Sequence, residues 1–445
     1  PRHYPLIGAM ADMRRDPIGF LTDLHSHYGP VAFTKLGMAN AYFLSSPDLI
    51  EDVLVGKHRN FCKDFATREL EPLVGKGLLT ADGDEWLQQR RLAQPPLQPK
   101  RIASYAQTMT ECAERLFDSF RDDEVRDISL DMAHLTLEIA GRCLLGADPR
   151  REAERIGHIM EVSMVYFDRQ LRTLEGILPK WLPTPDRVRM KAATDELDTI
   201  IYRIIERCRR DGAEADHLLG RLVNARDEDG HAMSDKQLRD EAVTMLLAGH
   251  ETTALTLAYA IYLLSEHPDV AASVRAEVDG TLGGRTPAFE DLPKLKRVDA
   301  VVRETLRLFP PAYIIAREVV EPIQLGEFLV PKGDQVLMSP YAMHHDPRWF
   351  REPERFDPTR WTNGETSGLP KFAYFPFGGG PRVCIGIHFA IMEAVLVLAS
   401  LLQHSELSVV PGYKVEVDPI VTLRPRNAIR AQVRRRKLAA RYRAA

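Results

Sequence analysis

The sequence predicts a mainly α-helical fold with small β-sheets (α+β), formed by one large domain. Apolar residues recur with helical spacing through most of residues 84–268. Short runs of strand character lie near the N-terminus and again after Pro311. The 445 residues contain no Ser/Gly-rich linker, low-complexity run or internal repeat, and their 44% apolar content is ample for a large core.

The first expected elements are two short strands, over residues 30–36 and 41–44, that form a hairpin around Gly37. Helices follow from about residue 84, with breaks at 95–96, 179–185 and Gly230. The longest helix begins after Gly230, where Ser234 and Gln237 form a capping-box pattern, and Pro268 ends it. Such a helix is ~45–50 Å long, so we expect it to cross the domain with its middle buried.

A further helix ends at Pro310, and strands are expected over 314–320, 323–330 and 335–338, with a turn at 331–334. The stretch from 339 to 376 is irregular and rich in proline and aromatic residues, and loops of that length are usually functional. A last helix follows Cys384, and late strands are expected within 406–433.

Charge and cysteine usage exclude several classes of protein. The net charge of −4 gives no overall basic excess for nucleic acid. Five scattered cysteines without a C-x-x-C pair indicate neither a disulfide framework nor a zinc site, and they fit a reducing, cytoplasmic compartment. No run of ~18 uncharged apolar residues predicts a membrane span in the given chain. A trimmed anchor before Pro1 stays open, and residues 424–445 form a basic C-terminal segment.

The most informative segment is residues 377–386, Phe-Gly-Gly-Gly-Pro-Arg-Val-Cys-Ile-Gly. It places Cys384 in a glycine-rich loop just before the apolar helical stretch 387–402. Backbone N–H groups that turn toward a sulfur, together with a helix N-terminus, favour a thiolate. The simpler interpretation is a buried structural cysteine, which is the usual state of a free thiol.

The middle of the long helix carries a second unusual segment, residues 248–253, Ala-Gly-His-Glu-Thr-Thr. A glycine inside a helix costs ~1 kcal/mol, and adjacent β-branched residues also disfavour the helix. A buried acid such as Glu251 is costly unless it is paired. These choices indicate function, although a kinked core helix in which Thr252 bonds back to a helix carbonyl remains an alternative.

The loop 377–386 resembles the haem-ligand loop of the cytochrome P-450 superfamily, Phe-x-x-Gly-x-Arg-x-Cys-x-Gly, at all five fixed positions. Residues 248–252 resemble the oxygen-activation motif of the same family. The resemblance implies one P-450 haem domain over residues 1–445, with the long helix over the haem. It also implies haem b held by the Cys384 thiolate, with O2 as co-substrate; thiolate ligation favours O–O cleavage.

The resemblance further implies the roles of individual residues. Thr252 would hydrogen-bond the bound dioxygen, Glu251 would relay protons from solvent, and Gly249 would leave room beside the dioxygen. Trp86 and Arg90 match the family's Trp-x-x-x-Arg helix, which holds haem propionates. The residues expected to contact the cofactor are Cys384, Trp86, Arg90, Ala248, Gly249, Arg317, Phe377, Gly378, Arg382 and Gly386.

Glu304 and Arg307 stand at i,i+3 on one predicted helix face and can pair. In the family this pair meets an arginine of the later irregular loop, and Pro353-Glu354-Arg355-Phe356 places Arg355 there. We expect this network to be structural rather than catalytic. Breaking a buried charged set of this kind should be severe.

The expected substrate pocket is apolar and aromatic, drawn from four separated parts of the chain: Phe65, Leu78, Phe167, Met245, Ala248, Ala312 and Ile314. The implied protein is a monomeric haem-thiolate monooxygenase that hydroxylates or epoxidises a hydrophobic small molecule, with fatty acids and terpenoids favoured.

No G-x-G-x-x-G follows a strand, so two electrons must come from a separate ferredoxin or flavoprotein system. A basic cluster at 90–91 and 100–101 is a candidate docking face. A peroxygenase or isomerase on the same fold, or a non-catalytic haem-binding sensor, are the alternatives.

Overall fold

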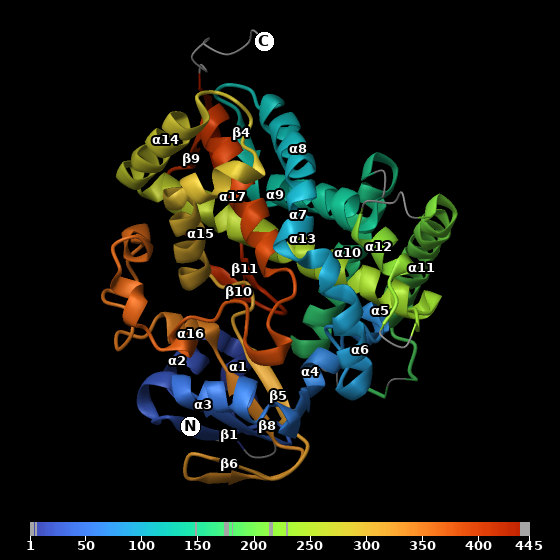
Figure 1. Cartoon of the computed structure of the whole chain (residues 1–445). Coiled ribbons are helices and arrows are strands. Elements are labelled where there is room, and N and C mark those ends of the chain that lie inside the picture. Colours follow the sequence, from blue (N-terminus) through green and yellow to red (C-terminus); the bar gives the residue numbers. More distant parts are fainter. Residues whose placement is uncertain are drawn as a thin grey trace.

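A computed structural model of the chain describes residues 4, 7–146, 149–172, 178–179, 181–212, 217–227 and 230–436. Most of these residues are helical, and the strands form small sheets at the periphery (Figure 1). The predicted fold class is confirmed. The helices are Met10–Arg15 (α1), Pro17–His27 (α2), Pro47–Glu51 (α3), Phe65–Arg68 (α4), Glu71–Val74 (α5), Gly83–Ala93 (α6), Pro99–Ile102 (α7), Ala106–Asp118 (α8), Ile128–Ala140 (α9), Pro149–Arg172 (α10), Pro185–Asp211 (α11), Leu218–Asn224 (α12), Asp235–Glu266 (α13), Pro268–Leu282 (α14), Lys296–Leu308 (α15), Pro340–His344 (α16) and Ile387–His404 (α17).

The largest sheet has five strands in the order β1-β2-β8-β5-β3, and β2 and β8 are its one parallel pair. It joins the N-terminal hairpin to strands that follow α15, so segments almost 300 residues apart lie side by side (Figure 1). A three-stranded sheet, β4-β12-β9, and the hairpins β6-β7 and β10-β11 complete the β-structure. The strands are Val31–Leu36 (β1), Ala39–Leu44 (β2), Phe61–Lys63 (β3), Val125–Asp127 (β4), Ile315–Val319 (β5), Ile323–Leu325 (β6), Phe328–Val330 (β7), Gln335–Met338 (β8), Ser405–Val409 (β9), Val417–Pro419 (β10), Leu423–Pro425 (β11) and Arg430–Arg435 (β12).

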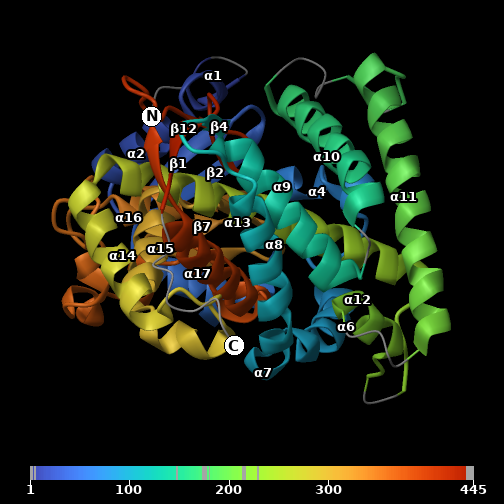
Figure 2. The same cartoon turned by 90° about the horizontal axis from the view of Figure 1, so that it is seen from above.

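Helix α13 crosses the middle of the molecule, with α9, α15 and α17 packed around it (Figures 1 and 2). Its start carries the predicted capping box: Gln237 N–H donates to Ser234 Oγ, and Ser234 N–H donates to Gln237 Oε1 at 2.9 Å. Pro268 ends α13 as predicted and begins α14 directly, since proline suits the first turn of a helix.

Two predicted elements differ from the structure. The single strand expected over 323–330 is the hairpin β6-β7, because Gly326 adopts a φ of +56° and turns the chain. The first half of the expected basic C-terminal segment is folded: residues 423–425 form β11, residues 430–435 form β12, and Arg436 pairs with Asp279 at 2.7 Å. Lys437, Arg441 and Arg443 lie outside the described residues.

By length and composition, α17 is the one described helix that could span a membrane. Most of it is buried in the largest hydrophobic cluster of the molecule, against α8, α13 and α15. Its apolar character is therefore that of a core helix.

Candidate active site

A cavity of about 430 Å³ lies where α13, α6, strand β5 and the loop before α17 meet. Helix α13 contributes one wall, and the loop that carries Cys384 contributes the opposite part of the lining. The lining includes predicted cofactor residues from all four elements: Trp86, Arg90, Ala248, Gly249, Arg317, Phe377, Gly378, Arg382, Cys384 and Gly386. The structure therefore gathers these ten predicted cofactor residues around one space.

The cysteine loop is shaped by glycines that no other residue could replace without strain. Gly378 and Gly380 have φ angles of +70° and +66°. A Cβ on Gly380 would lie 1.8 Å from the carbonyl oxygen of Leu54, so the loop packs directly against backbone there. Cys384 N–H donates to Phe377 O at 3.0 Å, which closes the loop and leaves the Cys384 side chain accessible to the cavity.

The surroundings of Cys384 do not by themselves favour a thiolate. Burial raises the pKa of the Cys384 thiol, whereas the N–H of Gly386 and the nearby Arg90 guanidinium lower it by less. The backbone N–H of the loop lowers the pKa of the thiol as expected, but desolvation raises this pKa by more. A bound metal cation would supply the missing positive charge, because metal ligation holds a thiol deprotonated.

Basic side chains form a second group in the cavity lining, apart from Cys384: Lys63, Arg90, Arg317 and Arg382. Lys63 is buried and Arg317 is half-buried, and neither forms an ion pair within the part of the chain that the structure describes. Burial, then Arg317 and Arg382, lowers the pKa of Lys63 to about 7, and burial, then Arg382, lowers the pKa of Arg317 to about 10. The nearby carboxylate of Asp82 pairs with Arg382, so it does not pair with Lys63 or Arg317.

This cation cluster fits the implied haem, whose two propionates are carboxylates that arginine and lysine bind well. The accessible thiol and the mainly apolar lining between thiol and cations fit the rest of the cofactor. Arg382 also stacks on Trp86, with its guanidinium carbon 4.3 Å from the ring centroid, so the predicted Trp86 helix and the cysteine loop meet here. Sequence reasoning missed Lys63, which is one position in a three-residue strand and carries no motif.

Helix α13 passes the cavity with its unusual segment. Ala248, Gly249 and Thr252 line the space, and a Cβ on Gly249 would lie 3.4 Å from Leu144. Thr252 Oγ1 donates to Ala248 O at 2.7 Å, which is the back-bonded arrangement that we kept as an alternative. Its oxygen still faces the cavity and can accept a hydrogen bond there.

Glu251 is the next residue but is not part of the cavity lining. Its Oε1 accepts hydrogen bonds from Thr422 Oγ1 and from Arg424 Nε, the latter at 2.6 Å. Both donors belong to the β10-β11 hairpin, which also accepts a bond from Tyr259 of α13 at Leu423 O. The acid and the alcohol of the motif therefore have different surroundings, and the hairpin holds the acid.

The predicted Glu304–Arg307 pair is present and fully buried, with a double hydrogen bond at 2.8 and 2.9 Å. The arginine that joins it is not Arg355, so this prediction is wrong. Arg360 Nε donates to Glu304 Oε1 at 3.0 Å, whereas the exposed Arg355 side chain pairs with Glu352. Residues 353–356 and 358–361 both read Pro-x-Arg-aromatic, and the chain buries the second arginine.

His344 connects this network to the cysteine loop. Its Nε2 accepts the N–H of Phe375 at 3.0 Å, and its Nδ1 lies 3.3 Å from Arg307 O. Burial holds the pKa of His344 well below its usual value, so the ring is neutral. No sequence motif marks His344 for this role, because its two contacts come from segments distant in sequence.

The apolar part of the cavity matches most of the predicted substrate pocket. Leu78, Met245, Ala248, Ala312 and Ile314 line it. Phe65 and Phe167 do not: Phe65 is 43% exposed on α4, and Phe167 is buried in the main core on α10. Both were predicted from regions that line the pocket in the resembling family, and within such a region an apolar residue fits a core or surface position equally well.

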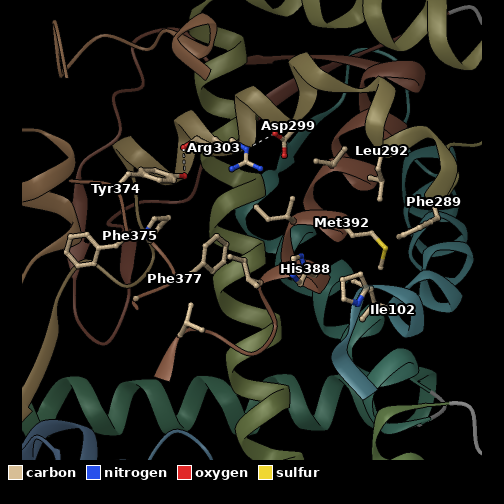
Figure 3. A pocket seen from close by; sticks show the side chains of 17 residues that line it. Ile102, Phe289, Leu292, Asp299, Arg303, Tyr374, Phe375, Phe377, His388 and Met392 are labelled. Atoms are coloured by element: carbon tan, nitrogen blue, oxygen red, sulfur yellow. Dashed lines mark hydrogen bonds and ion pairs between the residues drawn. The ribbon is translucent and has the colours of Figure 1, made fainter. Parts of the chain in front are cut away.

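A second cavity, of about 470 Å³, lies on the other side of the cysteine loop, between α7, α15 and α17. Figure 3 shows Phe375, Phe377 and Tyr374 on one side of it and Phe289, Leu292 and Met392 on the other. Arg303, paired with Asp299 at 2.6 Å, and His388 are its labelled basic groups. It shares Phe377 and Gly378 with the first cavity, so the loop separates the two spaces.

Comparison with known proteins places these observations in one context. Residues 1–429 match the family model described as Cytochrome P450. The chain is 36% identical over 427 residues to cyclooctatin synthase of Streptomyces melanosporofaciens, covering 95% of this chain and 92% of that protein. It is also 36% identical to cyclooctat-9-en-7-ol 5-monooxygenase of the same organism, covering 93% and 90%. Pentalenene oxygenase of Streptomyces avermitilis is 31% identical, covering 96% and 92%.

Proposed function

The chain belongs to the cytochrome P450 family, and from that premise we propose that it oxygenates a terpenoid at the cavity that Cys384 and Thr252 line. As a member of the family it is a haem-dependent monooxygenase that uses O2, acts on a hydrophobic small molecule and receives electrons from a separate redox partner. The observation that carries the assignment is a thiol and a cluster of cations on one mainly apolar cavity.

The names of its relatives support a terpenoid. Two of them are named for the oxygenation of cyclooctat-9-en-7-ol and pentalenene, which are terpenoid compounds. The aliphatic lining from Leu78, Met245 and Ile314 suits such a skeleton. No residue of the described cavity favours a fatty acid specifically.

In the proposed arrangement the Cys384 thiolate holds the haem iron, and Arg317, Arg382, Arg90 and Lys63 hold the propionates. When bound, haem supplies the binding and reductive activation of O2. Ala248 and Gly249 keep the helix close to the cofactor by having small or no side chains. The aliphatic wall excludes water and orients the substrate.

Proton delivery is the role that we propose for α13. Thr252 holds its hydroxyl at the cavity wall. There Oγ1 can accept a proton from a donor, and the hydroxyl can release its own proton into the cavity. Glu251 supplies protons from the side of the β10-β11 hairpin, where Thr422 and Arg424 hold it. A peroxygenase or an isomerase would have no use for this pair, so its presence favours the monooxygenase.

The redox partner would dock on the side of the second cavity. Arg91, Lys100 and Arg101 are exposed there, beside Pro99 and Ile102 of the cavity lining. We propose that this basic surface receives an acidic ferredoxin or flavoprotein.

We further propose a monomeric, cytoplasmic protein with one domain over its length; the five free cysteines suit a reducing compartment.

The experiment that tests the proposed function is the optical difference spectrum of the dithionite-reduced holoprotein with and without carbon monoxide. We expect a strongly red-shifted Soret band, and we expect Cys384→Ser to lose it while the far-ultraviolet circular dichroism is kept. Cys143→Ser, at a buried cysteine outside the cavity lining, is the matched control and should retain the band. A wild-type protein without the shifted band would contradict thiolate ligation.

A further inference from the structure

The cavity face of α13 continues beyond the residues discussed so far. Met245, Ala248 and Thr252 line the cavity. Glu241 precedes them at a spacing of four, seven and eleven residues, which places it on the same helix face. The helix therefore places an acid one turn before Met245, on the face that also carries Ala248 and Thr252.

Glu241 is fully buried, and neither of its carboxyl oxygens has a well-formed hydrogen bond. The N–H of Leu78 lies close enough to influence it but does not complete a bond. Thr244, one turn along and part of the cavity lining, is 5% exposed, and its hydroxyl also has no partner. Unpaired buried polar groups are costly, so their presence beside a cavity indicates a ligand. Thr244 lines the cavity, whereas Glu241 lies behind it and is not part of the lining, so the threonine hydroxyl is the group that a ligand can reach.

The neighbouring acid behaves differently. Asp240 accepts bonds from Lys76 N–H at 2.9 Å, from Lys236 Nζ at 2.8 Å and from Arg239 Nη1 at 3.1 Å. It therefore anchors the 75–79 segment onto α13 and satisfies the structural need for an acid at this place. Glu241 makes no such contact.

The 75–79 segment closes this end of the cavity against α13. A Cβ on Gly77 would lie 2.3 Å from Thr244 Oγ1, so the segment passes directly over the threonine. Leu78 and Leu79, which follow, line the cavity. Thr244 thus lies among apolar side chains of the lining, and its hydroxyl is the available partner for a polar group of a molecule bound at this end of the cavity.

The protonation state of Glu241 suits a neutral polar ligand. Burial raises the pKa of Glu241 to about 8; the nearby Leu78 N–H opposes this shift and Asp240 adds to it. The carboxyl group is therefore mostly protonated at neutral pH. It then offers one O–H donor and one carbonyl acceptor, and Thr244 offers a hydroxyl that can do either.

We propose that Thr244, with Glu241 buried behind it as a positioning residue, forms a polar subsite that binds a hydroxyl group already present on the substrate. This inference rests on the proposed function and names the substrate class more closely, as a terpenoid alcohol. Thr244 and Thr252 are eight residues apart, or about 12 Å along the helix axis. The bound hydroxyl would therefore lie at a different position along the cavity from Thr252.

The proposal places the protein in a sequence of reactions. A substrate that arrives with a hydroxyl group must come from an earlier step that introduced one, either another oxygenation or the capture of water by a carbocation. This protein would add a second oxygen at a distance from the first, and its product would be a diol or a more oxidised compound.

The test compares two probes that differ by one oxygen, geranylgeraniol and the hydrocarbon that lacks its hydroxyl. Each is titrated into the holoprotein, and the dissociation constant is read from the spin-state change of the Soret band. We expect wild type to bind the alcohol more tightly. Thr244→Val, which keeps the shape of the side chain, should weaken the alcohol roughly tenfold and leave the hydrocarbon unchanged.

A matched control lies on the same helix. Thr253 is also buried, lines the cavity and has an unpartnered hydroxyl, but it lies beside Thr252. We expect Thr253→Val to leave the ratio of the two dissociation constants unchanged. If Thr253→Val abolishes the ratio and Thr244→Val does not, the subsite is elsewhere and the proposal is overturned.

Glu241→Met gives an independent readout. It should lower the preference for the alcohol as Thr244→Val does, and it should raise the melting temperature, because it removes a buried unpaired carboxyl. A lowered melting temperature would mean that Glu241 supports the fold, against the proposal. A wild type that binds both probes equally, or neither, also overturns it. The carbon monoxide spectrum of each preparation distinguishes the two failures. If only the hydroxyl subsite is wrong, the red-shifted Soret band is retained; if the proposed function is wrong, the band is absent.

Discussion

Two arginines five residues apart differ completely in their surroundings. Arg360 is buried and bonds Glu304, Glu365 and the carbonyl of Arg351, whereas Arg355 extends from the surface. Trp361, next to Arg360, also donates to Glu304 Oε2 at 2.9 Å. One carboxylate therefore collects bonds from α15 and from the irregular loop, and it holds that loop in place.

We predict that Arg360→Ala destabilises the protein by about 3–5 kcal/mol, because it breaks the buried bonds of Arg360 to Glu304 and Glu365 and leaves a void in their place. Arg355→Ala should change the free energy of unfolding by no more than about 0.5 kcal/mol. Denaturant unfolding and the haem content of the purified protein check both. Equal effects of the two substitutions would contradict the assignment of the network to Arg360.

Thr252 gives a second prediction at the residue scale. Thr252→Ala should retain substrate binding but divert a large share of the electrons to peroxide, because the hydroxyl that hands on the proton is lost. Thr252→Ser, which keeps a hydroxyl, should restore much of the coupling. The measurement is product formed per reductant consumed, with peroxide assayed in parallel. Undiminished coupling in Thr252→Ala would remove the relay role from this side chain.

At this scale, the sequence predicted residues that belong to a short local pattern. Cys384, Arg382 and Thr252 lie where their motifs place them. Lys63, Arg360 and His344 were missed because each acts on segments from about 30 to about 320 residues away or lies in a pattern that occurs twice. Contacts of that kind depend on the packing of elements, which a local pattern does not specify.

At the scale of elements, the β10-β11 hairpin reaches the acid of α13. Three hydrogen bonds join the hairpin to α13. Arg424 and Thr422 donate to Glu251, and the Tyr259 hydroxyl donates to Leu423 O at 3.1 Å. Leu423 N–H also donates to Pro311 O at 2.9 Å, next to cavity residue Ala312. One short hairpin therefore contacts both the proton-supplying acid and the cavity wall.

Arg424→Gln should cost roughly 1–3 kcal/mol of stability, because it removes a charge-assisted bond to a buried acid. It should also make the 411–422 connection more susceptible to limited proteolysis. Arg426→Gln is the matched control in the same hairpin: its pair with Glu416 is exposed, and its loss should have little effect. Similar proteolysis of the two variants would show that the ion pair does not hold the hairpin.

Helix α13 could be predicted from sequence because its cap, its periodicity and its terminal proline agree. The β6-β7 hairpin could not, since its strands have only three residues each and a two-residue turn, Gly326-Glu327, separates them. The parallel pairing of β2 with β8 was also beyond the sequence, because it joins residues 41–44 to 335–338 and no local pattern records the partner.

At the scale of the whole molecule, charged and polar groups connect α15, α16, the irregular loop and the cysteine loop into one buried system. Glu304 and Arg307 lie at its centre, and His344 carries it to Phe375. Arg307 further donates to the carbonyls of His344 and Pro353, at 2.9 and 2.6 Å. Acid should therefore weaken the molecule as a unit.

We predict that the free energy of unfolding falls as the pH drops below about 6.5. The pKa of His344 is held well below its usual value in the folded protein, so the unfolded chain binds a proton that the folded one does not. Each such histidine contributes a slope of about 1.4 kcal/mol per pH unit. Urea unfolding at pH 6.5 and 5 measures the slope. It should decrease in His344→Gln but not in His27→Gln, at an exposed histidine.

His344 also has a defined tautomer. Because Nε2 accepts the Phe375 N–H, the ring proton resides on Nδ1, facing Arg307 O. Neither that proton nor the Phe375 amide can reach solvent unless the cysteine loop detaches from the interior. Their deuterium exchange rates therefore report the frequency of a local opening that global unfolding experiments do not resolve. Phe375 lies two residues before the cysteine loop, so the same exchange rate reports how firmly the start of that loop is held in the interior.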